Sequence, residues 1–274
     1  MSGKSEVVQF RADKGLMSQL LAVAQQQDLS VSALVRTWVV QRLRSELLQD
    51  KQDWQQSRFE AIAASLSKQF LPGPLLIIHA FPPPLAQEIP THKFASRGSV
   101  LPMLRRLPIE SRINRLGYES VRRQGELLDG YCQLFRNGRV ELVSAIGHHA
   151  TVIWGNSLEM DILLSVSSVV SYLSGMQFPL PYSILISVMQ AKDYWLEAIS
   201  NDSKVSFLFP HVAIQEDLFT VKEILIEAYG QASELKELAA VLYDAITEIW
   251  NASGVAASPS YDNDGEWHRT FSFY

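Results

Sequence analysis

Few residues in this sequence have the type and spacing that catalysis or metal binding requires. His148 and His149 are adjacent, so on a strand they would point to opposite faces and chelate a metal badly as a pair. His79 lies inside an apolar run, where a core histidine bonded through one ring nitrogen is the ordinary outcome. Cys132 is the one cysteine, which excludes an internal disulfide and a cysteine-rich zinc cage within one chain.

The motifs of the common enzyme classes are missing as well. The chain has no P-loop, no G-x-G-x-x-G, no H-E-x-x-H and no G-x-S-x-G. A nuclease of the D…E-x-K kind needs a lysine two residues after a strand carboxylate, and after Glu141 that position holds Val143. We therefore expect a protein that is not an enzyme and that uses no cofactor and no catalytic metal.

Arginines are the one remaining group of residues that could bind a ligand. Residues 93–139 hold ten Lys or Arg against four acidic residues, a balance of +6, whereas residues 213–274 hold three against eleven, a balance of −8. If the first region is helical, some of its arginines share a face and would bind DNA phosphate, a small anionic ligand or a protein. The other interpretation is that they pair with the acidic C-terminal helices. The candidate anion-binding residues are Arg105, Arg106, Arg112, Arg115, Arg122 and Arg123.

Composition indicates a folded chain. Hydrophobic residues make up 47% and charged residues 19% of 274 residues, which is enough apolar material for a core and too little charge for a disordered chain. No apolar run reaches the roughly 18 residues of a membrane helix, and residues 1–10 lack the apolar stretch of a signal peptide. We expect a cytoplasmic protein without a membrane partner.

A small module is expected at the N-terminus, over residues 1–48. Residues 7–12 alternate with the period of a strand, residues 16–27 repeat at helical spacing, and Ser30 is placed to cap a second helix that runs to about residue 47. One short strand and two helices cannot bury a core alone, because a chain of this size has too little interior. The pattern therefore predicts that two chains share this module, as a homodimer or a higher assembly.

Residues 7–47 resemble the ribbon-helix-helix (Arc-type) DNA-binding module. The resemblance rests on the Phe10-Arg11-Ala12-Asp13 entry, the helix around residues 20–24 and the Ser30-x-Ser32-x-Leu34-Val35-Arg36 start of the second helix. It implies that two strands, one per chain, pair into a ribbon that lies in the major groove of double-stranded DNA. The DNA-binding residues that it implies are Val7, Gln9 and Arg11 at base edges and Ser30, Val31 and Ser32 at a phosphate.

The sequence departs from the family pattern between the two helices. Asp28 stands where a glycine is common, and Asp13 and Asp28 add negative charge near the expected phosphate contact. A module that only dimerises the chain, and whose polar residues are merely solvated, is the alternative interpretation.

A larger domain is expected to follow a connector helix at residues 49–71. Within residues 72–251 the patterns predict a buried strand at 75–81, a hairpin at 131–143 with a type I′ turn at Asn137-Gly138, a strand at 182–189 and another at 205–209. Helices are expected at 157–174, 221–229 and 234–250. Residues 252–274 form a flexible tail unless its aromatic rings dock. The fold class is therefore α+β, with an N-terminal ribbon-helix-helix module before a larger mixed α/β domain.

Residues 73–250 are also similar to the C-terminal domain of bacterial proteins that carry an Alba-type, Schlafen-like DNA-binding domain. The similarity lies in residues 75–81, 112–117 and 131–141. It implies a nucleic-acid module placed before an α/β domain. The sequence thus predicts a dimeric, sequence-specific DNA-binding protein, a transcriptional regulator whose α/β domain senses a ligand or partner. The alternative is a non-enzymatic scaffold protein that uses its N-terminal module only to dimerise.

Overall fold

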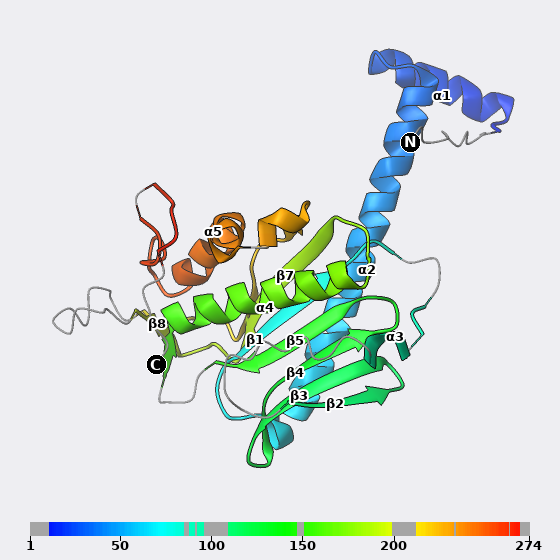
Figure 1. Ribbon diagram of the computed structural model, residues 1–274. Coiled ribbons are helices and arrows are strands. Elements are labelled where there is room, and N and C mark those ends of the chain that lie inside the picture. The colour runs from blue at the N-terminus through cyan, green and yellow to red at the C-terminus, as the bar shows by residue number, and fades with distance from the viewer. Residues whose placement is uncertain are drawn as a thin grey trace. The chain divides into compact units, whose positions relative to one another are not determined.

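The computed structural model describes residues 11–84, 88–90, 92–95, 109–146, 151–198, 212–232, 234–262 and 264–268. The chain divides into two compact units, residues 1–60 and residues 61–274 (Figure 1). The first unit contains α1 (Lys14–Gln26) and most of α2 (Val31–Gln69), and the second contains the sheet and the remaining helices. The chain is therefore of mixed α+β class, as expected. No helix in these ranges is long and apolar enough to cross a membrane.

Short polar residues define the two N-terminal helices. Asp13 caps α1, because its Oδ1 accepts a hydrogen bond of 2.8 Å from the amide of Leu16. Ser30 caps α2 in the same way, with its Oγ accepting from the amide of Ala33 at 3.2 Å. Between them Asp28 adopts φ +53°, the left-handed conformation for which glycine and, less often, aspartate are suited. Asp13 and Asp28, the two departures noted above, thus have local structural roles.

The conformation of Asp28 predicts a clear difference between two substitutions. Asp28→Val is expected to lower the free energy of unfolding by about 1–2 kcal/mol, because a β-branched side chain clashes with its own carbonyl in the left-handed region. Asp28→Gly is the matched control and is expected to be at least as stable as the natural chain. Thermal unfolding followed by far-ultraviolet circular dichroism measures both. Equal losses in the two variants would contradict this account of the turn.

The second helix is longer than the sequence pattern predicted. Helix α2 runs 39 residues without a break, so the expected second helix of the module and the expected connector at 49–71 are one element. It ends at the Pro72-Gly73-Pro74 segment, where proline removes the amide that a further turn would need. Just before that point Phe70 bridges Leu128, and the amide of Leu71 donates to the carbonyl of Leu128 at 2.9 Å.

An antiparallel sheet is the centre of the second unit. Its order is β10-β7-β1-β5-β4-β3-β2, with β9 also paired to β7. The strands are β1 (Leu75–Phe81), β2 (Ile109–Asn114), β3 (Gly117–Gln124), β4 (Leu127–Phe135), β5 (Val140–Ala145), β7 (Tyr182–Met189), β9 (Leu218–Thr220) and β10 (Ile224–Ile226). Strands β2 to β5 form a meander, and β1 then pairs with β5 on one side and β7 on the other. A separate parallel pair joins β6 (Val152–Trp154) to β8 (Trp195–Glu197).

Helices α4 (Gly155–Gly175) and α5 (Leu235–Asn251) cover one face of this sheet (Figure 1). Alternate residues of each strand point to that face, which is why Leu76 and Ile78 of β1 join the same buried cluster as Val166 of α4 and Leu242 of α5. The strand and helix predicted at 75–81 and 157–174 are confirmed, as are the strand at 182–189 and the helix at 234–250.

The hairpin predicted at 131–143 is confirmed, but its turn is of another type. Leu134 pairs with Val140, whereas a two-residue Asn-Gly loop would pair Phe135 with Val140. Only Gly138 has a positive φ, +87°, whereas a type I′ turn needs positive φ at Asn137 as well. The amide of Gly138 donates to the carbonyl of Phe135, and the amide of Phe135 donates to the carbonyl of Arg139. The connection is therefore a three-residue loop with a glycine bulge.

Of two other predictions in the larger domain, one is wrong and one lies outside the described residues. The helix expected at 221–229 is wrong, because this segment forms β10 and then enters the short 3₁₀ helix η1 (Tyr229–Ala232). Its apolar residues alternate with a strand period at Ile224 and Ile226, both of which are buried. The strand expected at 205–209 lies outside the described residues. A short helix, α3 (His92–Ala95), was not expected.

The start of the C-terminal segment docks on the core. Tyr261 is buried, donates its hydroxyl to the carbonyl of Ala239 at 2.9 Å, and packs edge-on against Tyr243. Ser258 donates to the buried carboxylate of Glu159, which also accepts from Trp250 Nε1 at 2.6 Å. Burial raises the pKa of Glu159, against hydrogen bonds that lower it. Because rings of the segment pack on the core, the flexible tail predicted from residue 252 does not begin at that point.

Candidate nucleic-acid interface

The structure describes only part of the expected DNA-reading strand. Val7 and Gln9 lie outside the described residues. Arg11 is exposed and precedes α1, and residues 11–13 belong to neither a helix nor a strand. The described part of the chain therefore contains no strand before α1, and the ribbon stays a prediction.

The phosphate-binding residues predicted from the resemblance do lie at a helix N-terminus. Val31 and Ser32 begin α2, directly after the capping residue Ser30, and the first turn carries no acidic side chain. The first amides of a helix have no partner within it and attract anions. The charge of this unit is nearly balanced, since the first fifty residues hold six basic and five acidic residues, so the helix start and not the net charge favours an anion.

The two N-terminal helices expose an unusual amount of apolar surface. Only Leu20, Ala24 and Leu34 form a buried cluster between them. Ten of the sixteen strongly exposed large apolar side chains in the described residues lie between residues 16 and 48, which is too many to be scattered surface contacts. They are Leu16, Met17, Leu21, Leu29, Trp38, Val39, Val40, Leu43, Leu47 and Leu48.

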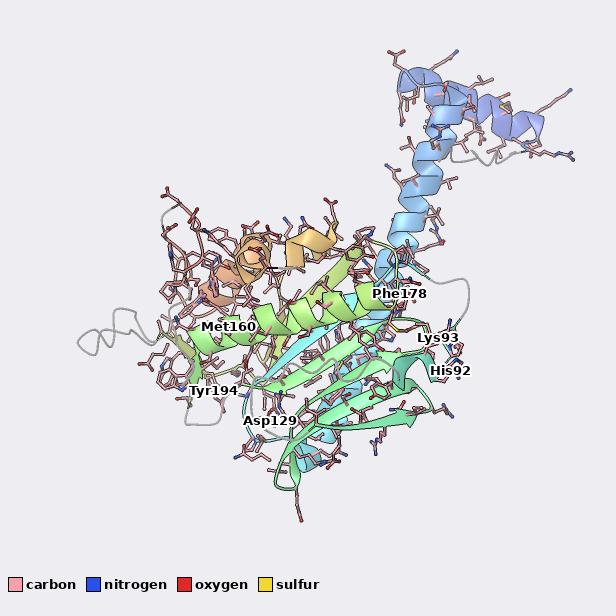
Figure 2. All side chains as sticks on the ribbon, viewed as in Figure 1. His92, Lys93, Asp129, Met160, Phe178 and Tyr194 are labelled. Carbon is pink, nitrogen blue, oxygen red and sulfur yellow. The ribbon has the colours of Figure 1, made fainter. Side chains whose placement is uncertain are left out.

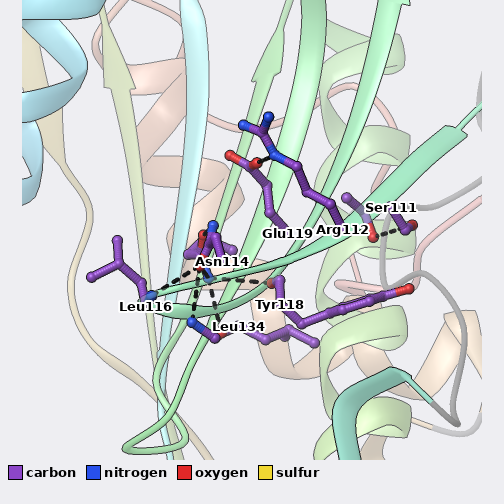
Figure 3. A network of polar contacts seen from close by, with 10 residues as sticks. Ser111, Arg112, Asn114, Leu116, Tyr118, Glu119 and Leu134 are labelled. Atoms are coloured by element: carbon purple, nitrogen blue, oxygen red, sulfur yellow. Dashed lines mark hydrogen bonds and ion pairs between the residues drawn. The ribbon is translucent and has the colours of Figure 1, made fainter. Parts of the chain in front are cut away.

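The arginine group predicted as a helical anion site is not helical where it is described. Arg112 lies on the edge strand β2, and its Nε forms a 2.5 Å ion pair with Glu119 of β3. Arg115 is exposed in the turn that follows. Figure 3 shows this region, where Asn114 Oδ1 accepts from the amides of Leu116 and Gly117 at 2.9 Å. Asn114 also donates to Gln133 Oε1 at 2.7 Å, which fixes the turn to the meander.

Two further arginines of the group have bonding partners within the same meander. Arg122 is 2% exposed and pairs through Nε with Asp129, whose side chain is fully buried (Figure 2 labels Asp129). Arg123 donates to the carbonyl of Glu126 at 3.0 Å. Arg105 and Arg106 lie outside the described residues. The described arginines thus form neither one anion-binding face nor bridges to the acidic C-terminal helices, because strand pairing supplies nearer partners.

A buried polar group occupies the sheet face opposite α4. His79 of β1 faces Glu141 of β5 in register, with 3.1 Å between His79 Nε2 and Glu141 Oε2, and both side chains are fully buried. Tyr131 donates its hydroxyl to Glu141 Oε1 at 2.5 Å. The core-histidine interpretation of His79 thus has a named partner. Because this group is buried, it offers no surface to a ligand.

The remaining candidates for chemistry are inert or not described. The thiol of Cys132 is buried, and burial, followed by the charge of Glu141, raises its pKa far above the ordinary value, so it is not a nucleophile. His148 and His149 lie outside the described residues. The sequence interpretation missed Glu141 as the partner of His79 and Tyr131 as a donor to Glu141, since strand register brings these residues together.

The larger unit has a shallow cleft beside the end of α4. Its volume is about 320 Å³, and it is lined by Glu88, Ile89, Pro90, Lys93, Met176, Gln177 and Phe178. Figure 2 labels two of these residues, Lys93 and Phe178. A cleft of this size and mixed lining fits a small ligand with an apolar part.

Comparison with known proteins adds no assignment. Protein-family models, curated proteins and solved structures give no significant match to this chain.

Proposed function

We propose that this protein is a dimeric, sequence-specific DNA-binding protein that regulates transcription. Two N-terminal units pair, residues 7–12 of both chains form a ribbon, and the ribbon enters the major groove of double-stranded DNA. The α/β domain adjusts this binding in response to a ligand or partner.

The observation that carries the proposal is the apolar surface of α1 and α2. Three buried residues cannot stabilise a two-helix unit, because a unit this small buries too little of its surface. Pairing two copies would bury the exposed apolar side chains and supply the missing core. Each apolar side chain that becomes fully buried contributes about 1.5–3 kcal/mol, so several of them can stabilise a dimer.

The chemistry at the start of each helix supports DNA as the partner. Arg11 is exposed immediately before α1, and an arginine can form a two-bond contact with guanine. The amides at the start of α2 favour a phosphate nearby.

The second unit supports a sensing role through its cleft. Its lining combines the charged residues Lys93 and Glu88 with apolar residues such as Ile89 and Phe178. A ligand with a charged group and a hydrocarbon part matches both.

The proposal predicts that Arg11→Ala abolishes sequence-specific binding. Loss of a bidentate base contact costs about 1–3 kcal/mol in each half-site, hence about 2–6 kcal/mol for the dimer, which lowers the affinity roughly 30- to 10,000-fold. The ligand is the DNA recovered with tagged protein from cells, and fluorescence anisotropy at fixed salt measures binding. Sedimentation should show that the dimer survives.

Arg112→Ala is the matched control, because it removes an exposed arginine of the sheet edge and should leave the affinity unchanged. Unchanged affinity of Arg11→Ala would overturn the proposal. A chain that dimerises yet retains no DNA at low salt would favour the scaffold alternative.

A further inference from the structure

Three metal-ligating side chains converge on the C-terminal segment, in a place that the proposed function does not use. Asp262, Glu266 and His268 each offer one ligand atom, and these atoms lie within 4.8 Å of one another. All three side chains are exposed, so an ion and its remaining water ligands could reach them. The set is not purely acidic, since His268 contributes an imidazole nitrogen.

The backbone beneath these side chains is held at several points. Tyr261 and Trp267 form an antiparallel bridge, and the amide of His268 donates to the carbonyl of Ser260 at 2.7 Å. The amide of Asp262 donates to the carbonyl of Glu266 at 3.0 Å. The buried ring of Tyr261 fixes this hairpin to α5. An ion would therefore bind to a formed scaffold and would not have to order a loose chain.

The side chains already concentrate negative charge and attract cations. His268 Nε2 lies 2.7 Å from Asp262 Oδ2, and Lys236 Nζ lies 2.9 Å from Glu266 Oε2. Lys236 is exposed, and an exposed ion pair of this kind is easily displaced.

We propose that Asp262, Glu266 and His268 bind a divalent first-row transition metal ion of the zinc class. Each chain would supply three ligands, Asp262 Oδ2, one carboxylate oxygen of Glu266 and His268 Nε2, and water would complete the coordination. Zn²⁺ requires ligand distances of about 2.0–2.2 Å, which small rotations of three exposed side chains around their fixed backbone can provide.

The donor chemistry selects this class of ion over calcium and magnesium. Those hard cations prefer six or more oxygen ligands, and an imidazole nitrogen fits them poorly. One nitrogen and two carboxylates match zinc, and the open positions leave water on the metal. Binding would clamp both arms of the hairpin and hence strengthen the docking of residues 258–268 on α5.

Isothermal titration of the full-length protein with zinc chloride tests the proposal. We expect a site that His268→Ala weakens by more than about tenfold, since even loss of an outer partner of a metal ligand costs 10–100-fold. Asp262→Asn should weaken it similarly while its remaining oxygen still accepts the turn hydrogen bonds of Asp264 and Glu266. His92→Ala, an exposed histidine outside the cluster, is the matched control and should have no effect.

Two further readouts separate metal binding from a structural role. Lys236→Met removes the competing cation and should tighten zinc binding. Hydrogen exchange of residues 258–268 should slow when zinc is added to the natural chain but not to His268→Ala. Absence of zinc binding below about 1 mM, which corresponds to about 4 kcal/mol, overturns the proposal. Zinc binding that both ligand variants leave unchanged overturns it too. DNA binding by Arg11→Ala is read separately, so either proposal can fail alone.

Discussion

Replacing Leu43 and Leu47 together by glutamate is expected to convert the paired protein into single chains. The two residues are one helical turn apart on α2, so they share one face, and they are 53% and 45% exposed. Each leucine that a partner buries contributes about 1.5–3 kcal/mol, so losing two costs roughly 3–6 kcal/mol before any charge effect. Two carboxylates in an apolar interface add a further penalty. The dissociation constant should rise at least about 100-fold.

Analytical ultracentrifugation over a dilution series measures this change. The matched comparison is Gln41→Glu with Ser45→Glu, which places the same two charges one turn apart on the other side of α2, beside Trp38 and Leu48, and should weaken the dimer less than the leucine pair does. Far-ultraviolet circular dichroism of the separated chains should also show reduced helix content, because Leu20, Ala24 and Leu34 alone do not stabilise the unit. A natural chain that sediments as a monomer, or a glutamate pair without effect, contradicts the dimer.

The parts of the fold that sequence alone predicted are those with a strong and unbroken hydrophobic signal. Strand β1 is apolar at six of seven positions and is buried throughout, and the long amphipathic helix α5 repeats at steps of three and four. The N-terminal cap of α2 was equally predictable, since Ser30 caps this helix where expected. In each case the residues that decide the structure lie within a few positions of one another along the chain.

The arginine-rich segment shows why the rest could not be predicted. Its arginines would share one face only if the backbone were helical, yet the described part of this segment forms β2 and β3, two polar strands at one end of the sheet. Polar and charged residues occupy most positions of β2 and β3, which leaves little apolar alternation to mark a strand. Strand register then decides which charges meet, as Arg112 with Glu119 and His79 with Glu141. No spacing rule along one chain gives that register.

The candidate interface was predicted in part for the same reason. Ser30, Val31 and Ser32 lie where the resemblance implies, since they belong to a helix start that is specified locally. Whether Arg11 reads a base depends on a second chain, which no pattern within one sequence can place. The metal-ligating group of Asp262, Glu266 and His268 was overlooked because it lies in a segment taken as a loose tail. Three ligand-type residues within seven positions, around a glycine turn, are the signal that could have revealed it.

The second large effect is expected at the buried pair of Arg122 and Asp129. Asp129→Ala should lower the free energy of unfolding of the α/β domain by about 3–5 kcal/mol, because it leaves a guanidinium at a site that is 2% exposed without its carboxylate. Asp129 lies at an irregularity of the sheet. The register of β3 and β4 shifts there, between the pair of Arg122 with Gly130 and the pair of Arg123 with Leu128. Urea unfolding monitored by near-ultraviolet circular dichroism measures the loss.

Arg112→Ala provides the control, since this ion pair lies on the same meander but its arginine is 71% exposed and should be worth at most about 1 kcal/mol. If Asp129→Ala lowers the free energy of unfolding no more than Arg112→Ala does, the predicted cost of the unpaired buried charge is wrong. The double variant Arg122→Met with Asp129→Leu removes both charges and fills similar volume, so it should be more stable than Asp129→Ala alone. That order follows from the cost of an isolated buried charge. A double variant as stable as the natural chain would show in addition that the pair carries little net stability of its own. The two buried charges would then matter chiefly by making other registers of β3 and β4 unfavourable, because a one-residue slip would separate Arg122 from Asp129 inside the core.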